Sequence, residues 1–252
     1  MLRAQVGIAA SPMKLEFNGP AGSQQTMVVT LTNPTDRVLE ASATLADWDR
    51  DSLGDIRVYP AGTTPASCAA QIKLFPSPHV SIPPGEHRDL TLMMDLQKDT
   101  LSSLANCMLF VTQTNPMGGK DKNGVSIQLT VRVGIQVFYT PPGIYKKDID
   151  IVDFRDGPDT AASRVLWLTL QNKGGLETDG KVGWELTNLE TGKKTELDAS
   201  RFYTLPGARR VLRMPLGADL PRGKYSMTAL VDFGQDQELK IGDLEFSYEG
   251  GR

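Results

Sequence analysis

The two cysteines and two histidines carry the most distinctive chemistry in this chain. Cys68 and Cys107 are its only cysteines, and His79 and His87 its only histidines. Thiolate and imidazole are the ligands that structural zinc prefers, but these four residues lack the compact spacing of a zinc site. We interpret both histidines as surface residues beside a proline-rich turn. For the cysteines we favour a disulfide, with two buried thiols as the alternative.

Four carboxylates that lie close together in the sequence are the second candidate for chemistry. Asp47, Asp49, Asp51 and Asp55 bring the oxygen ligands that calcium prefers. No calcium-loop spacing orders them, so we expect a solvated acidic loop and keep a weak calcium site as the alternative.

Motifs of the common enzyme classes are absent. The sequence has no P-loop, no dinucleotide-binding glycine fingerprint and no Gly-x-Ser-x-Gly elbow. Residues 11–14 match the Ser-x-x-Lys spacing of serine β-lactam enzymes, but the companion motifs are missing. We therefore expect no catalytic residues, no cofactor and no metal.

Composition favours an all-β globular protein. The chain has 252 residues, of which 40% are hydrophobic and 23% charged, and 24 glycines and 16 prolines punctuate short apolar runs. No run approaches the ~18 apolar residues of a membrane helix, and the net charge of −3 gives no reason to expect nucleic-acid binding. The first eleven residues lack the apolar core of a secretory signal.

One long alternating stretch must position any binding surface. Odd positions from Val125 to Val137 are all apolar, and most even positions between them are polar. This period of two predicts a β-strand with one apolar face, spanning residues 125–139. A strand of that length exceeds the usual ~5–6 residues and is well suited to pairing with another chain. The alternative is an ordinary strand that only buries its apolar face in its own domain.

Shorter runs of the same kind surround it. They predict strands at 13–17, 26–32, 39–48, 56–59, 90–94 and 107–112 in the first half, and at 165–172, 181–188, 225–233 and 239–248 in the second. We also expect a short helical turn at 100–105. The pattern restarts after Pro141 and Pro142, so we predict two tandem immunoglobulin-like β-sandwich domains, residues 1–142 and 143–252.

Several short motifs follow one another in a specific order. They are Ser-Pro at 11–12, Phe-Asn-Gly at 17–19, Thr-Leu-Thr-Asn at 30–33, Phe-Pro-Ser-Pro at 75–78, Ile-Pro-Pro-Gly at 82–85, Met-Leu-Phe at 108–110 and Ile-Gln-Val-Phe-Tyr-Thr-Pro at 135–141. In this order the first half resembles the PapD-like periplasmic chaperones of pilus and fimbrial subunits. The second half matches more loosely, through residues 172–175, 205–207 and 231–234.

The resemblance implies a non-enzymatic periplasmic chaperone whose signal peptide is absent from this sequence. In the family, the last strand of the first domain lends its apolar side chains to an incomplete subunit fold, and two basic residues anchor the subunit's C-terminal carboxylate. The anchor positions fall on Lys14 and on Gln136, which is uncharged, and Arg132 is the candidate for the missing charge. The strand residues are Ile127, Leu129, Val131, Val133 and Ile135.

These expectations define the partners. They are pilus- or fimbria-type subunits, with an outer-membrane usher as a further candidate, and no nucleic acid or membrane span. We expect a monomer or a weakly self-associated dimer. The alternative function is a non-catalytic structural or adhesive protein with the same tandem domains.

Overall fold

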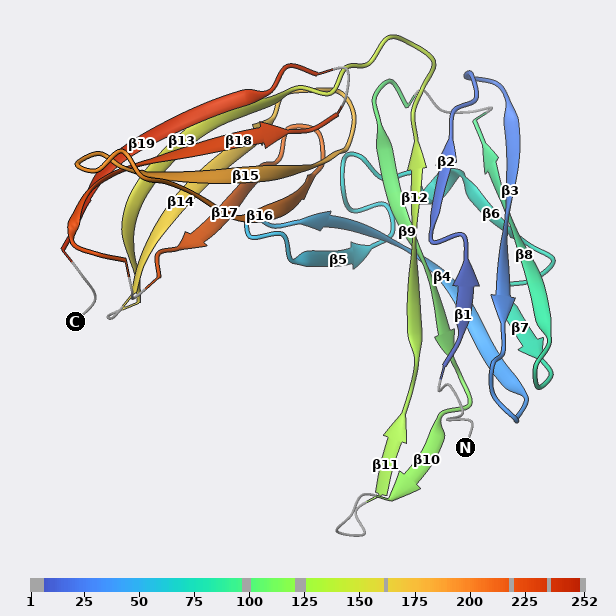
Figure 1. Ribbon diagram of the computed structural model, residues 1–252. Coiled ribbons are helices and arrows are strands. Elements are labelled where there is room, and N and C mark those ends of the chain that lie inside the picture. The colour runs from blue at the N-terminus through green and yellow to red at the C-terminus, as the bar shows by residue number, and fades with distance from the viewer. Residues whose placement is uncertain are drawn as a thin grey trace. The chain divides into compact units, whose positions relative to one another are not determined.

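The protein is built almost entirely of strands, which form two compact units. The computed structural model describes residues 7–96, 101–120, 126–160, 163–217, 220–234 and 237–249. The first unit comprises residues 1–48 and 58–143, and the second comprises residues 49–57 and 144–252. Both units are immunoglobulin-like β-sandwiches, which confirms the predicted fold class (Figure 1).

Two sheets make up the first unit. Sheet A comprises, in spatial order, β1 (Ala9–Ser11), β3 (Gln24–Thr32), β8 (His87–Asp95) and β6 (Ile72–Phe75). Sheet B comprises, in order, β2 (Lys14–Phe17), β12 (Arg132–Tyr139), β9 (Ala105–Gln113), β4 (Leu39–Arg50) and β5 (Ile56–Pro60), and β7 (His79–Ile82) also pairs with β4. Residues 49–50 of β4 and 56–57 of β5 are counted with the second unit. A hairpin of β10 (Met117–Lys120) and β11 (Ser126–Leu129) extends past the ends of β9 and β12 (Figure 1).

The core of this unit lies between the inner faces of sheets A and B. Leu31 and Leu92 of sheet A, and Leu109 and Val137 of sheet B, are fully buried there. Each such side chain contributes roughly 1.5–3 kcal/mol relative to an exposed one. Of these four residues, Val137 belongs to the apolar row that alternation predicted on one face of its strand.

The long strand predicted at 125–139 is wrong as a continuous element. Residues 130 and 131 lie outside any strand, and they separate β11, which pairs with β10, from β12, which pairs with β9. Leu129 is opposite Met117 whereas Arg132 is opposite Thr112, so four residues on one side face two on the other. The two extra residues cannot pair, and the ladder breaks. Val125 lies outside the described residues.

A short 3-10 helix, η1 (Ala69–Gln71), follows Cys68 and was not predicted. The helical turn expected at 100–105 is not found at residues 101–104, and Ala105 already begins β9; residue 100 lies outside the described part. Among the residues that the structure describes, the helical turn follows the first cysteine and does not precede the second.

The second unit also contains two sheets. The first comprises β13 (Ile149–Thr160), β14 (Ser163–Asn172) and β17 (Arg209–Pro215) in that order. The other comprises, in order, β16 (Lys194–Thr204), β15 (Thr178–Asn188), β18 (Gly223–Asp232) and β19 (Lys240–Tyr248). Leu168, Leu170, Trp184 and Met227 meet in its core. The sequence pattern missed β13, because a register shift between Ile151 and Asp153 breaks its alternation.

Candidate functional site

The apolar row of β11 and β12 passes from the core to the surface. Val137 and Ile135 are 0% exposed and pack in the first unit's core, and Val133 is half-buried against it. Val131 is half-buried beside the backbone of Gly7, and Leu129 is 48% exposed. Ile135, which was predicted to contact a subunit, thus belongs to the domain's own core in this structure.

Leu129 is exposed because the chain leaves the sandwich there. Its strand, β11, pairs with β10 in a separate two-stranded ladder, with Leu129 opposite Met117. For Ile127, the remaining predicted contact, the structure describes the backbone, which lies opposite Gly119. The exposed part of the predicted row therefore lies on this extension.

In the described part of the chain, one edge of β12 beside this row has no hydrogen-bonded strand partner, and we call it the open edge. β9 pairs with the whole of β12, but β2 pairs only with Gln136–Tyr139. Among the described residues, Arg132–Ile135 therefore has a hydrogen-bonded strand partner on one side only, and β1 contacts β12 without pairing with it. Gln113 donates its N–H to the carbonyl of Val131, at 2.9 Å, from the β9 side. Gln136 donates instead to Met13, at 3.0 Å, on the β2 side. Since bonding direction alternates along a strand, the backbone groups of the even residues Arg132 and Gly134 face the open edge.

The predicted anchor residues Lys14 and Gln136 are brought together. They are register partners in the parallel pairing of β2 with β12, and both project from the outer face of sheet B, since Leu15 and Val137 face the core. The ammonium of Lys14 lies 2.6 Å from a carboxylate oxygen of Glu16 and 5.1 Å from the ring centroid of Phe138. A cation over an aromatic face is attracted by the ring quadrupole.

Arg132 lies apart from this pair. It is four residues from Gln136 along β12, or about 13 Å at the rise of a strand. Its guanidinium lies 3.5 Å from the ring centroid of Phe110, so it stacks there. Between them on the same face of β12 is Gly134, where an added Cβ would lie 2.7 Å from the sulfur of Met108. The geometry thus gives Arg132 a stacking partner and does not place it at the Lys14 anchor.

Sequence reasoning missed two members of this cluster, Glu16 and Phe138. Glu16 is two residues from Lys14, and period two already puts both side chains on one face of β2. Phe138 is buried on the outer face of sheet B and packs edge-on against Trp48, with ring centroids 5.9 Å apart. Phe138 is at an even position of β12, so alternation along the strand could have placed it on the outer face. The prediction considered only the apolar row at odd positions.

Cys68 and Cys107 are adjacent and buried. Their sulfur atoms lie 2.9 Å apart, and both residues are present as free thiols. Burial raises the pKa of the Cys107 thiol well above its usual value, and the neighbouring Cys68 raises it further. The structure thus brings the predicted pair together in the reduced state, and the disulfide stays a prediction.

The histidines and the acidic cluster do not converge. Among the described residues, no group of three or more His, Cys, Asp or Glu side chains could hold a metal ion. Asp47 accepts hydrogen bonds from the Thr64 N–H at 2.7 Å and from the Ser67 hydroxyl at 2.6 Å. Asp47 therefore holds the loop that contains Thr64 and Ser67, whereas Asp49 pairs with Arg57 at 2.8 Å and joins β4 to β5.

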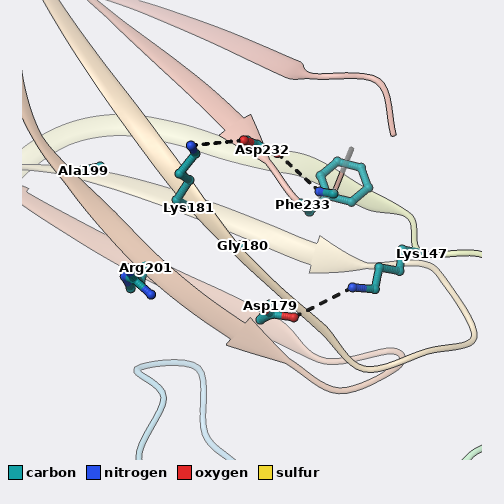
Figure 2. A pocket seen from close by; sticks show the side chains of 9 residues that line it. Lys147, Asp179, Gly180, Lys181, Ala199, Arg201, Asp232 and Phe233 are labelled. Atoms are coloured by element: carbon teal, nitrogen blue, oxygen red, sulfur yellow. Dashed lines mark hydrogen bonds and ion pairs between the residues drawn. The ribbon is translucent and has the colours of Figure 1, made fainter. Parts of the chain in front are cut away.

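A hollow of about 520 Å³ lies on the second unit and was not predicted. Two ion pairs line it, Lys147 with Asp179 at 3.8 Å and Lys181 with Asp232 at 3.4 Å, and Arg201 projects beside them (Figure 2). Each pair has at least one side chain that is mostly exposed, and exposed pairs contribute little free energy. The hollow is a charged surface feature to which we assign no ligand. No helix that could cross a lipid bilayer occurs in the described ranges.

Several solved structures have a fold similar to that of this chain. The Class 5 fimbriae chaperone CfaA aligns with a TM-score of 0.50 and 8% identity, over 96% of this chain and 98% of its own. The E. coli chaperone DraB gives 0.48 and 18% over 96% and 98%. The CsuC–CsuE chaperone–tip subunit complex of Acinetobacter baumannii gives 0.47 and 15% over 83% and 91%. No family model and no curated protein matches the sequence.

The alignment with CfaA covers nearly the whole of both chains, at an identity that indicates the fold alone. The expected resemblance to PapD-like chaperones is confirmed at this level. The chain has the two-domain β-sandwich fold of a fimbrial chaperone.

Proposed function

We propose that this protein is a periplasmic chaperone that binds pilus- or fimbria-type subunits by strand addition. The single observation that supports it best is the open edge of Arg132–Ile135, which continues into a row of apolar side chains that become progressively exposed. A free strand edge offers backbone hydrogen bonds, and alternate side chains beside it fill a partner's pockets.

The subunit contacts fall to Val133, Val131 and Leu129. The exposed Leu129 would contribute roughly 1.5–3 kcal/mol when buried in a subunit groove, before the costs of ordering and association, and the half-buried Val131 and Val133 would contribute less. Ile127 extends the same row by alternation along β11. Ile135 holds the strand in the chaperone's own core and leaves the contacts to the residues before it.

The anchor for the subunit's C-terminal carboxylate is Lys14, with Gln136 beside it. A lysine ammonium has three donors on a flexible stem, and the glutamine amide adds a neutral donor. This pair carries one positive charge, so we infer a weaker carboxylate site than two basic residues would give. The role is binding and not catalysis, and an outer-membrane usher is the further partner.

Periplasmic co-expression with each small β-rich secreted protein encoded beside this gene tests the proposal. The intact chain is expected to capture one of them, and Leu129→Asp with Val131→Asp is expected to abolish capture while the chain stays folded by circular dichroism. Val28→Asp is the matched control, because Val28 is 46% exposed on sheet A and Leu129 is 48% exposed. Capture that survives the double substitution in a folded chain, or that Val28→Asp abolishes equally, would overturn the proposal. A double variant that unfolds would favour a structural role for the strand, and the single Leu129→Asp variant then decides whether capture depends on the row.

A further inference from the structure

The Lys14 anchor already has a carboxylate beside it. Glu16 lies on the same face of β2, and its Oε1 is 2.6 Å from the Lys14 ammonium. In register, Lys14 is opposite Gln136 and Glu16 is opposite Phe138, so the four side chains form a square on the outer face of sheet B. Within this square the lysine and glutamate charges cancel.

We infer that Glu16 is an internal competitor for the carboxylate that Lys14 binds. An incoming carboxylate meets an ammonium that Glu16 already contacts, and it either displaces Glu16 or lies next to a second negative charge. Gln136 cannot offset that charge, because its amide is neutral. Glu16 thus lowers the affinity of the anchor for a partner's terminal carboxylate. This inference rests on the proposed function, which makes Lys14 the anchor.

The expected effect of Glu16 on carboxylate binding is small, because both side chains of the ion pair are exposed to water. The Lys14 and Glu16 side chains are 40% and 64% exposed, so the pair is screened by water and is worth the modest free energy of a surface ion pair. Its removal should therefore strengthen carboxylate binding by about 1.4-fold to fivefold. A change of that size adjusts affinity without creating or abolishing the site.

Acetate, a small carboxylate, is the probe. The full chain labelled with ¹³C-lysine is titrated with sodium acetate at constant ionic strength, and the Lys14 Cε resonance is followed by NMR. Glu16→Gln is expected to increase the initial response to acetate by about 1.4-fold to fivefold over the unsubstituted chain. Glu16→Thr, a neutral residue that favours strands, should do the same and guards against a local effect of glutamine.

Glu86→Gln is the matched control. Glu86 pairs with Arg88 at 2.9 Å, with the same two-residue spacing and a similar exposure of 53%, and it immediately precedes β8 of sheet A. It should leave the Lys14 response unchanged. An unchanged response in both Glu16 variants, or an equal gain in Glu86→Gln, would overturn the inference. Expected acetate responses with no subunit captured in co-expression would refute the proposed function and leave the Glu16 competition standing.

Discussion

Gln136 lies directly opposite Lys14, although the two residues come from strands at opposite ends of the first unit's sequence. The parallel pairing of β2 with β12 fixes this register, and the Gln136 N–H donates to the Met13 carbonyl at 3.0 Å. Neighbouring strands lie ~4.8 Å apart, so the two side chains can act on one ligand group. The anchor is therefore a property of the sheet pairing and not of a flexible loop.

Substitution at the anchor should change subunit affinity in opposite directions. Lys14→Ala removes the only full positive charge of the pair and is expected to weaken binding at least tenfold, since a charged hydrogen bond contributes roughly 1.5–3 kcal/mol. Gln136→Lys should strengthen binding or leave it unchanged. Calorimetry with the captured subunit measures both. A subunit affinity that Lys14→Ala leaves unchanged but that falls when Leu129 is substituted would show that the open edge pairs with the subunit without a carboxylate anchor.

The cysteine pair should close in an oxidising compartment. Thiol–disulfide exchange with an oxidised donor disulfide would join Cys68 and Cys107 by an S–S bond. The two thiols lose two protons and two electrons, and the donor disulfide is reduced to two thiols. Intact mass spectrometry of non-reduced protein is expected to show a loss of about 2 Da. The bond closes a loop of about 40 residues and should stabilise the fold by on the order of 4 kcal/mol against urea. Two free thiols after isolation from the periplasm would contradict this.

The reduced protein should protect its thiols from alkylation. Burial raises the pKa of Cys107 well above 9.0, so the thiol stays protonated at neutral pH and the reactive thiolate is scarce. Because the pKa of Cys107 is higher in the folded state, its contribution to stability is fully present below the unfolded-state pKa. That contribution is lost as the pH rises through the folded-state pKa. We expect iodoacetamide to label Cys107 only after unfolding. Rapid labelling of the folded chain at pH 7 would be inconsistent with a buried, protonated thiol.

Asp47 should stabilise the first unit in a pH-dependent way. Burial alone would raise the pKa of Asp47, but hydrogen bonds from Ser67, Thr64 and the Gly62 backbone outweigh it and lower the pKa below 3.8. The contribution of the Asp47 carboxylate to stability is therefore present above its unfolded-state pKa and is lost as the pH falls through its folded-state pKa. Asp47→Asn should cost about 1–3 kcal/mol in urea unfolding at pH 7 and less near pH 3. An equal loss at both pH values would contradict the ionised form.

Two glycines of one strand, β15, should differ sharply in their tolerance of alanine. A Cβ at Gly180 would lie 2.4 Å from the carbonyl oxygen of Asp232 and 2.6 Å from the ring of Phe202, whereas one at Gly183 would meet nothing closer than 3.7 Å. Gly180→Ala is expected to destabilise the second unit by about 1–3 kcal/mol. Gly183→Ala should be neutral or slightly stabilising, because it reduces the freedom of the unfolded chain. Thermal unfolding of both variants measures the difference, and similar midpoints would contradict the close approach.

Alternation along single strands made much of the fold predictable. Period two identified the inward residues of β12 and the tandem sandwiches, and the family resemblance brought Lys14 and Gln136 together. It could not show where the row leaves the core, because that depends on how far sheet A covers sheet B. Ile135 and Leu129 follow the same pattern in the sequence, yet one is fully buried and the other is 48% exposed.

The break at residues 130–131 and the role of Glu16 needed the structure. The break arises from the unequal lengths of residues 113–116 and 130–131, which only the register of the two hairpin arms reveals. Glu16 shares a face with Lys14 by simple spacing, but the ion pair depends on how both side chains are oriented. Sequence periodicity determines the face on which a side chain lies and leaves its contacts open.

Amide hydrogen exchange at the open edge of β12 tests the central claim most directly. In the free chain, the N–H groups of Arg132 and Gly134 face away from β9, and those of Val133 and Ile135 face towards it. We predict that a bound subunit slows exchange at Arg132 and Gly134 at least tenfold, because its strand accepts hydrogen bonds from them, and changes Val133 and Ile135 much less. A stable complex in which Arg132 and Gly134 exchange as fast as in the free chain would contradict strand addition at this edge.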